Sequence, residues 1–155
     1  MKFQGVNGAV STKGYEKWIE CTSFNFGIGR SIGTAARSTI NREGSEPNFG
    51  EVMITKAYDV SSVKLIEDAW GGHLDNKVEF KFTTTVKDGI QHFLSIELEK
   101  CGVSAYHVSS DQQGNPTESV ALNYAKITIN HTGMDSKTSG QPIRAGYDLE
   151  KMGKS

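Results

Sequence analysis

The chain has 155 residues, which is enough for one domain with its own core spanning residues 1–155, and 17 basic side chains balance 18 acidic ones to leave a net charge of −1. This balance gives no support to nucleic-acid binding through bulk positive charge. No segment approaches the roughly 20 apolar residues that a membrane-spanning helix needs, and no apolar segment at the start of the chain has the form of a secretory signal, so neither membrane insertion nor signal-directed export is expected.

The first predicted strand begins at Glu16 and continues to Ile28. Large apolar residues such as Phe24 and Phe26 alternate there with small or polar ones. Alternation at spacing two is typical of a strand with one buried face. Trp18 lies on this strand and is a candidate core residue.

A long extended loop is predicted over about residues 30–50. It is polar and small, and a loop of this length in a compact domain is usually functional or engaged with a partner. The side chains that would make such contacts are two apolar anchors and four charged residues: Ile32, Phe49, Arg37, Arg42, Glu43 and Glu46.

The strand predicted over residues 51–59 leads into the one convincing helix, at about residues 62–70. Ser61 or Ser62 is expected to cap it, and two consecutive glycines at 71 and 72 are expected to end it. Ile66 and Trp70 belong to its apolar face and are expected to pack against the sheet.

Four of the further predicted strands after the helix are short or of ordinary length. Residues 77–86 alternate apolar with polar side chains, a turn at 87–89 reverses the chain, and the returning strand places Leu94, Ile96 and Leu98 on one side. Residues 101–109 form a separate predicted strand, and residues 143–152 a short last one.

Residues 114–132 are predicted to be the long central strand. Val120, Leu122 and Tyr124 share one face, whereas Ile127 carries apolar character onto the other. A change of face within one strand indicates a bulge or bend near residues 125–127, where the strand passes from one packed surface to another. Leu122 and Tyr124 are candidate core residues.

No catalytic or cofactor site is predicted. The glycines at 27, 29 and 33 depart from the dinucleotide-binding spacing, and the four histidines lie on different elements without metal-ligand spacing. Cys21 and Cys101 form no CxxC pair, so two reduced, partly buried thiols are expected, with a disulfide or redox role as the alternative. What remains is a mainly antiparallel β protein whose two-sided strands need a partner, which favours self-assembly over an enzyme.

Three stretches resemble the Hcp family, which forms the inner tube of bacterial type VI secretion systems. They are residues 14–20 (GYEKWIE), 52–65 (VMITKAYDVSSVKL) and 116–127 (PTESVALNYAKI), and residues 147–149 (YDL) are similar to a C-terminal element of the family. The sequence departs from the family pattern at Val63, where many members have proline, and at Thr128 and Ile129, which replace a common aromatic residue.

The resemblance implies a compact antiparallel two-sheet β-barrel with one helix. It also implies a structural role without cofactors, in which hexameric rings stack as a tube inside a contractile sheath, carry a spike, and can hold small effectors in the channel. The protein would be made in the bacterial cytoplasm and secreted without a signal peptide. Subunit or ring-stacking contacts would involve the loop residues named above together with Ile127. A monomeric ligand-binding β-barrel is the alternative function.

Overall fold

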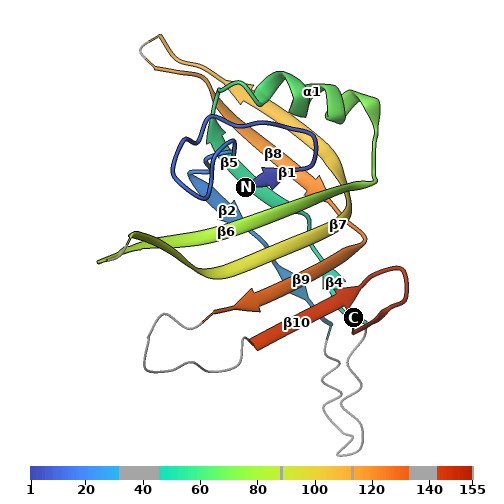
Figure 1. Cartoon of the computed structure of the whole chain (residues 1–155). Coiled ribbons are helices and arrows are strands. Elements are labelled where there is room, and N and C mark those ends of the chain that lie inside the picture. Colours follow the sequence, from blue (N-terminus) through green and yellow to red (C-terminus); the bar gives the residue numbers. More distant parts are fainter. Residues whose placement is uncertain (32–45, 88, 113, 133–142, 155) are drawn as a thin grey trace, which may run out of the picture.

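The computed structural model describes residues 1–31, 46–87, 89–112, 114–132 and 143–154 (Figure 1). Its elements in chain order are β1 (Lys2–Phe3), β2 (Ser23–Asn25), β3 (Ile28–Gly29), β4 (Asn48–Phe49), β5 (Val52–Ala57), α1 (Ser62–Gly71), β6 (Asn76–Val86), β7 (Gly89–Ser109), β8 (Thr117–Asn123), β9 (Lys126–His131), β10 (Ile143–Asp148) and β11 (Gly153–Lys154). The mainly antiparallel β fold with one short helix is confirmed. Across the described ranges, no helix has the length and apolar character required to span a bilayer.

Strand β7 organises the fold. Its first half pairs with β6 on one side and with β9 on the other, and its second half pairs with β8. The sequence predicted two separate strands here. The structure instead holds one strand of 21 residues, in which Lys100 has a φ of 51° at the division between the two halves. A single left-handed residue lets the strand change direction while its pairing partners continue on both sides.

The predicted central strand is divided at the predicted place. β8 ends at Asn123 and β9 begins at Lys126, and the backbone N–H of Ala125 still donates to the Glu99 carbonyl at 3.2 Å. The bend therefore transfers the chain from pairing with the second half of β7 to pairing with its first half. The predicted bend near residues 125–127 is confirmed.

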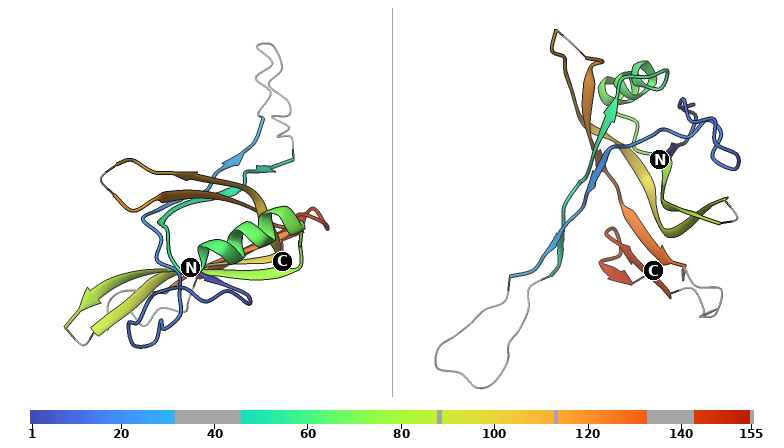
Figure 2. Two further views of the ribbon diagram at one scale, coloured as in Figure 1. Left: turned by 90° about the horizontal axis from the view of Figure 1, so that it is seen from above. Right: turned by 90° about the vertical axis from the view of Figure 1, so that its left-hand side faces the viewer.

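Two sheets result from this bend. Sheet A contains β1, β6, the first half of β7, β9, β10 and β11, and sheet B contains the second half of β7, β8, β5 and β2. The sheets share β7 and enclose one core (Figure 1). A separate pair, β3 with β4, extends away from both sheets (Figure 2).

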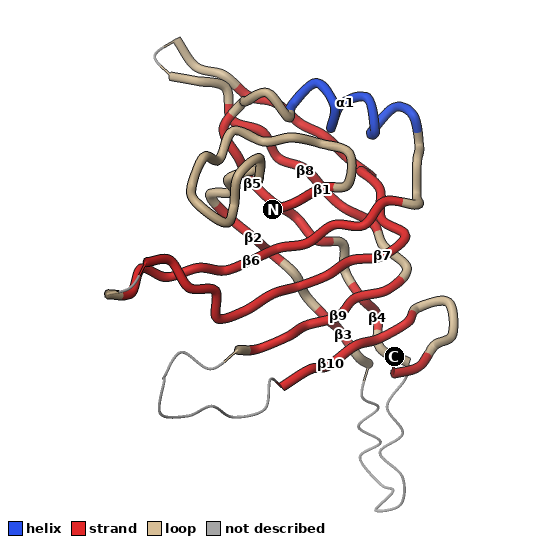
Figure 3. The backbone as a smooth tube through the Cα atoms, viewed as in Figure 1, coloured by secondary structure: helices blue, strands red, loops and turns tan. Residues whose placement is uncertain are grey.

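The strand predicted from Glu16 is mostly absent. Only Ser23–Asn25 and Ile28–Gly29 are strands, and residues 4–22 form the loop that runs beside β1 (Figure 3). This segment is held by scattered backbone bonds instead of a ladder, such as the 2.7 Å bond from the Ile19 N–H to the Met1 carbonyl. Lys17 has a φ of 63°, which is incompatible with a continuous strand.

Helix α1 covers one end of the two sheets and packs mainly on β7 (Figure 1). It ends as predicted, because Gly72 adopts a φ of 68° and donates its N–H to the Asp68 carbonyl. The serine cap was predicted wrongly. Ser61 makes no side-chain cap, and the Asp59 carboxylate instead accepts the Ser61 N–H at 2.9 Å.

Candidate functional site

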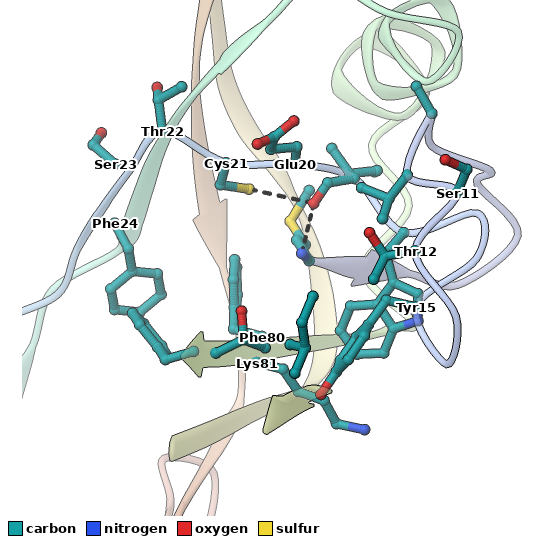
Figure 4. A pocket seen from close by; sticks show the side chains of 18 residues that line it. Ser11, Thr12, Tyr15, Glu20, Cys21, Thr22, Ser23, Phe24, Phe80 and Lys81 are labelled. Atoms are coloured by element: carbon teal, nitrogen blue, oxygen red, sulfur yellow. Dashed lines mark hydrogen bonds between the residues drawn. The ribbon is translucent and has the colours of Figure 1, made fainter. Parts of the chain in front are cut away.

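A groove of about 660 Å³ lies between the N-terminal loop and the edges of β2 and β6 (Figure 4). Phe24 of β2 bridges the two sheets here, since its ring meets Phe80 edge-on at 4.9 Å and Phe82 at 5.1 Å. At the mouth, the Lys81 ammonium lies 5.0 Å from the Trp18 ring centre. The groove is therefore an open seam between two sheet edges, lined by aromatic rings.

The thiol that lines this groove is unreactive. The Cys21 Sγ lies 3.9 Å from the Ile19 carbonyl oxygen, and burial raises the pKa of this thiol, which keeps it neutral. Cys21 and Cys101 are both free, as predicted, and Cys101 is buried. Within the described ranges, no three His, Cys, Asp or Glu side chains converge in a way that would hold a metal ion.

A buried charge network closes the end of sheet B beneath α1. The Lys56 ammonium is fully buried and donates to Glu118 Oε2 at 2.7 Å, to Asp59 Oδ1 at 2.9 Å and to Ser62 Oγ at 3.2 Å. Tyr106 donates its hydroxyl hydrogen to the second oxygen of Glu118, which is also fully buried. Each buried charge thus has several partners, which is the condition under which a buried ion pair is tolerated.

The Asp59 carboxylate joins this network to the start of the helix. Desolvation by burial is the largest single effect and raises its pKa. The hydrogen bonds from Ser61 and Lys56 together outweigh that effect, so the pKa of Asp59 lies below its ordinary value. The network therefore fixes the turn from β5 into α1 with the carboxylate ionised.

A second buried carboxylate holds the other end of the helix. Asp68 accepts the backbone N–H of Val103 at 2.9 Å and the side-chain N–H of Asn76 at 2.9 Å. These bonds tie α1 to β7 and to the start of β6. The position of the helix is thus set at both ends by carboxylates, half-buried Asp59 at its start and buried Asp68 near its end.

Sequence reasoning missed the Lys56 network, although a signal was present. Lys56 continues the face of Val52 and Ile54, and Glu118 continues the face of Val120 and Leu122. A charged residue of each sign on the buried face of a strand predicts an ion pair, because an isolated buried charge is too costly.

The outward faces of the two sheets differ in charge. Sheet A has a polar outer face, on which Ser95 and Thr128 are buried: Lys77, Glu79, Lys81, Ser95, Glu97, Glu99, Lys126, Thr128, Asn130, Arg144 and Asp148. Sheet B presents what we call the uncharged face, which holds no Asp, Glu, Lys or Arg: Ser23, Asn25, Met53, Thr55, Ala57, Ala105, His107, Ser109, Thr117, Ser119, Ala121 and Asn123.

The residues predicted for intersubunit contacts fall in different places. Glu46 is exposed, whereas Phe49 is half-buried and stacks on Tyr147 of the same chain at 4.5 Å. Ile127 is only 2% exposed and lies in the core beside Leu98, so its placement at an interface was wrong. The remaining four predicted residues lie outside the described part of the chain: Ile32, Arg37, Arg42 and Glu43.

The residues predicted to pack in the core differ in how far they are buried. Leu122 and Tyr124 are buried, and Tyr124 donates its hydroxyl hydrogen to the Gly50 carbonyl at 2.9 Å. Trp18 and Ile66 are half-buried. Trp70 is 75% exposed, so the prediction that it packs against the sheets of its own chain was wrong.

The rotation of α1 explains the exposure of Trp70. The helix buries Ser62, Leu65 and Asp68, and Trp70 lies on a different side. Four exposed apolar residues follow the outer side of α1 and its two ends, and we call them the helix ridge: Val60, Val63, Trp70 and Leu74.

Comparison with protein families gives one match. The model of the family described as "Type VI secretion system effector, Hcp" matches residues 1–131. None of the curated proteins compared with the chain matches it.

Solved structures share the fold over nearly the whole chain. A structure described as a type six secretion system protein is 25% identical, with a TM-score of 0.89 over 99% of this chain and 96% of the other. Hcp1 from Salmonella typhimurium is 17% identical, with a TM-score of 0.76 over 99% and 95% of the two chains. A type VI secretion system effector from Yersinia pestis is 16% identical, with a TM-score of 0.74 over 95% and 96%.

Proposed function

The chain belongs to the Hcp family of type VI secretion system effectors, and from that premise we propose that it is a structural tube protein whose copies join into hexameric rings. The observation that carries this proposal is the construction of sheet A, which has two open edges of opposite strand direction. The Hcp family is a structural, secreted family and not an enzyme class.

The first open edge belongs to β6. The two-residue strand β1 pairs with Val78 and Glu79, and Gln4 bonds to Lys77 beside them, so residues 80–86 of β6 have no strand partner on that side in the described ranges. Unpaired N–H and C=O groups along an edge strand are a template for another chain.

The second open edge belongs to β10. Strand β11 pairs only with Tyr147 and Asp148, which leaves residues 143–146 without a partner on the outer side in the part of the chain that the structure describes. At the start of this edge, Ile143 is 71% exposed. Each edge is thus covered over a short part of its strand and open over the remainder in the described residues.

Strand direction makes the two edges compatible. The order β6, β7, β9, β10 contains four strands, each antiparallel to its neighbour. β10 therefore runs opposite to β6. When copies are related by rotation, β10 of one copy meets β6 of the next in antiparallel pairing. Such a head-to-tail contact closes into a ring.

The polar face of sheet A suits the lining of a water-filled channel. Three of its lysines pair with glutamates on the same face, with separations of 3.0 Å for Lys77–Glu97, 3.3 Å for Lys81–Glu79 and 3.3 Å for Lys126–Glu99. Because the charges compensate one another, the lining carries no strong preference for one sign of cargo. Small effector proteins are the cargo that we propose.

We assign the remaining parts of the system by family. Rings stack as a tube within the contractile sheath, the tube carries the spike, and the protein passes from the bacterial cytoplasm to the outside with the expelled tube. The loop from Ser31 to Gly50 remains our proposed stacking contact. Deletion of residues 34–45 should abolish stacking of rings in electron micrographs, and unchanged stacking would contradict this assignment.

A variant at the β10 edge tests ring formation. Ile143→Asp introduces a charge at an exposed edge position, so the monomer should fold normally while rings are lost. Native mass spectrometry of the wild type should show a hexamer, and that of the variant a monomer. Val108→Lys, which adds a charge at an exposed position of sheet B opposite Glu118, is the control and should leave the hexamer intact.

The competing function is that of a monomeric ligand-binding protein. It rests on the 660 Å³ groove, whose aromatic lining would suit an apolar ligand. A wild-type chain that stays monomeric at high concentration would favour this function over the tube.

A further inference from the structure

The helix ridge is an apolar surface that stays mostly exposed among the described residues, although the Leu74 side chain lies against β7. Val63 and Trp70 are seven residues apart, which places them two turns apart on one side of α1. Val60 extends the ridge before the helix and is 72% exposed, and Leu74 extends it beyond the end. Glu67 lies between Val63 and Trp70 on this side, so the ridge is a row of exposed apolar side chains with one charged residue among them. Several exposed apolar residues on one side of a helix favour a contact site.

The ridge carries no net charge that would select a charged partner. The two charged side chains beside it, Lys64 and Glu67, pair with each other at 2.5 Å. Tryptophan is among the residues most enriched at the centres of protein interfaces, where charge is depleted. A protein surface that is itself uncharged is therefore the partner that fits the ridge.

The same chain provides such a surface in the uncharged face of sheet B. Its middle consists of small side chains, among which Ala105 lies half-buried beside the buried Ala121 on β7 and β8. Met53 on β5 is an exposed apolar side chain beside them. Large side chains on a helix pack closely on a sheet that offers small ones, and helix on sheet is a common layer arrangement.

Within one copy, Leu74 of the ridge touches sheet B at Gly102 of β7. Leu65 and Asp68 of α1 face the core, whereas the other ridge residues stay exposed along the helix, which lies across one end of the sheets (Figure 2). We infer that the helix ridge of one copy packs on the uncharged face of sheet B in a neighbouring copy. This inference rests on the proposed self-assembly, and it adds a second contact that is independent of the sheet A edges.

A head-to-tail contact explains why both surfaces are present. Each copy offers one ridge and one uncharged face, so a closed assembly covers every ridge and every face. A two-fold contact between two ridges would leave both uncharged faces open. The inference therefore assigns the neighbouring copy, and not an unrelated protein, to both surfaces.

Fluorescence of Trp70 tests the inference directly. The chain contains two tryptophans, so Trp18→Phe leaves Trp70 as the sole emitter. The quenching of Trp70 fluorescence by acrylamide should fall severalfold when dilute monomers assemble, because the neighbouring copy covers the side chain. Hexamers that form while Trp70 remains as quenchable as in the monomer would overturn the inference and leave the proposed function standing. A wild-type chain that never assembles would overturn both.

Cross-linking between two singly substituted chains tests the pairing of surfaces. In a Cys21→Ser background, buried Cys101 remains, and burial raises its pKa to about 12, which keeps it unreactive. A Val63→Cys chain mixed with a Met53→Cys chain should give at least tenfold more bismaleimide-linked dimer than either chain alone.

The matched control for this experiment is a Lys13→Cys chain mixed with the same Met53→Cys chain. Lys13 is exposed on the N-terminal loop, outside both surfaces. Equal yields from the control and the Val63→Cys mixture, with hexamers present, would overturn the inference.

Discussion

Sheets A and B share a strand and a core but face the outside in opposite ways. In sheet A the apolar side chains face inward and lysines and glutamates face outward, whereas in sheet B the outward face is uncharged and the charges of Lys56 and Glu118 lie inside. Sheet A has the face expected of a surface in contact with water. Sheet B has the face expected of a surface that another protein covers. Under the proposed assembly, this difference assigns sheet A to the channel lining and sheet B to a contact between copies.

The largest expected effect on stability comes from removing a charge inside sheet B. Lys56→Met leaves Glu118 buried without its partner, so the free energy of unfolding should fall by about 3–5 kcal/mol. The double variant Lys56→Met with Glu118→Leu should lose less free energy of unfolding, because no buried carboxylate is left at position 118 without its cation. Urea unfolding of the monomer measures the free energy of unfolding of the single and the double variant. Equal losses in the single and double variants would contradict a dominant ion pair.

Matched substitutions in the two sheets test whether their interiors are equivalent. Leu98 in sheet A and Leu122 in sheet B are both fully buried. Replacing either with Ala removes the same atoms and should cost about 2–5 kcal/mol, with the spread set by how far each site collapses. Thermal and urea unfolding provide the comparison. A cost below 1 kcal/mol at one site alone would show that only one sheet carries the core.

The sequence predicts one kind of feature well and another poorly. Alternation of apolar residues located the bend at residues 125–127 and the burial of Leu122, because both depend on local side-chain order. It failed for the strand at residues 16–22, where alternation is present but Lys17 adopts a left-handed conformation. It also failed for Ile127, whose direction depends on which sheet β9 joins.

The helix shows why amphipathicity alone was insufficient. The apolar residues of α1 cover more than one side, and the sequence does not say which side faces the sheets. Asp68 decides the rotation by accepting the Val103 N–H, a contact that a hydrophobic pattern cannot reveal. Trp70 is left outside as a consequence. Under the proposed assembly, the exposed apolar residues of α1 belong to a contact between copies, and they can be identified only once the orientation of the helix in the monomer is known.

The ionised Asp59 predicts acid sensitivity for the charged end of sheet B. Its pKa is lowered in the folded chain, so its stabilising contribution is complete above the unfolded value of about 3.9 and is lost as pH falls through the folded value. The melting temperature of the wild type should exceed that of Asp59→Asn at neutral pH. This gap should narrow below about pH 4. A gap that stays constant down to pH 2 would contradict the assigned hydrogen bonds.

The smallest expected effect concerns the charges outside sheet A. Lys126 and Glu99 pair at 3.3 Å with side chains that are 29% and 44% exposed. Water screens such a pair, so Lys126→Met should change the free energy of unfolding by less than about 1 kcal/mol, and added salt should reduce that change further. The same substitution at Lys56 is the contrast, since the charge and the new residue are identical and only the side of the sheet differs. Burial is the only physical reason for the two substitutions to differ in their effect on the free energy of unfolding. Equal effects would therefore contradict the assignment of Lys126 to a face in water and of Lys56 to the interior.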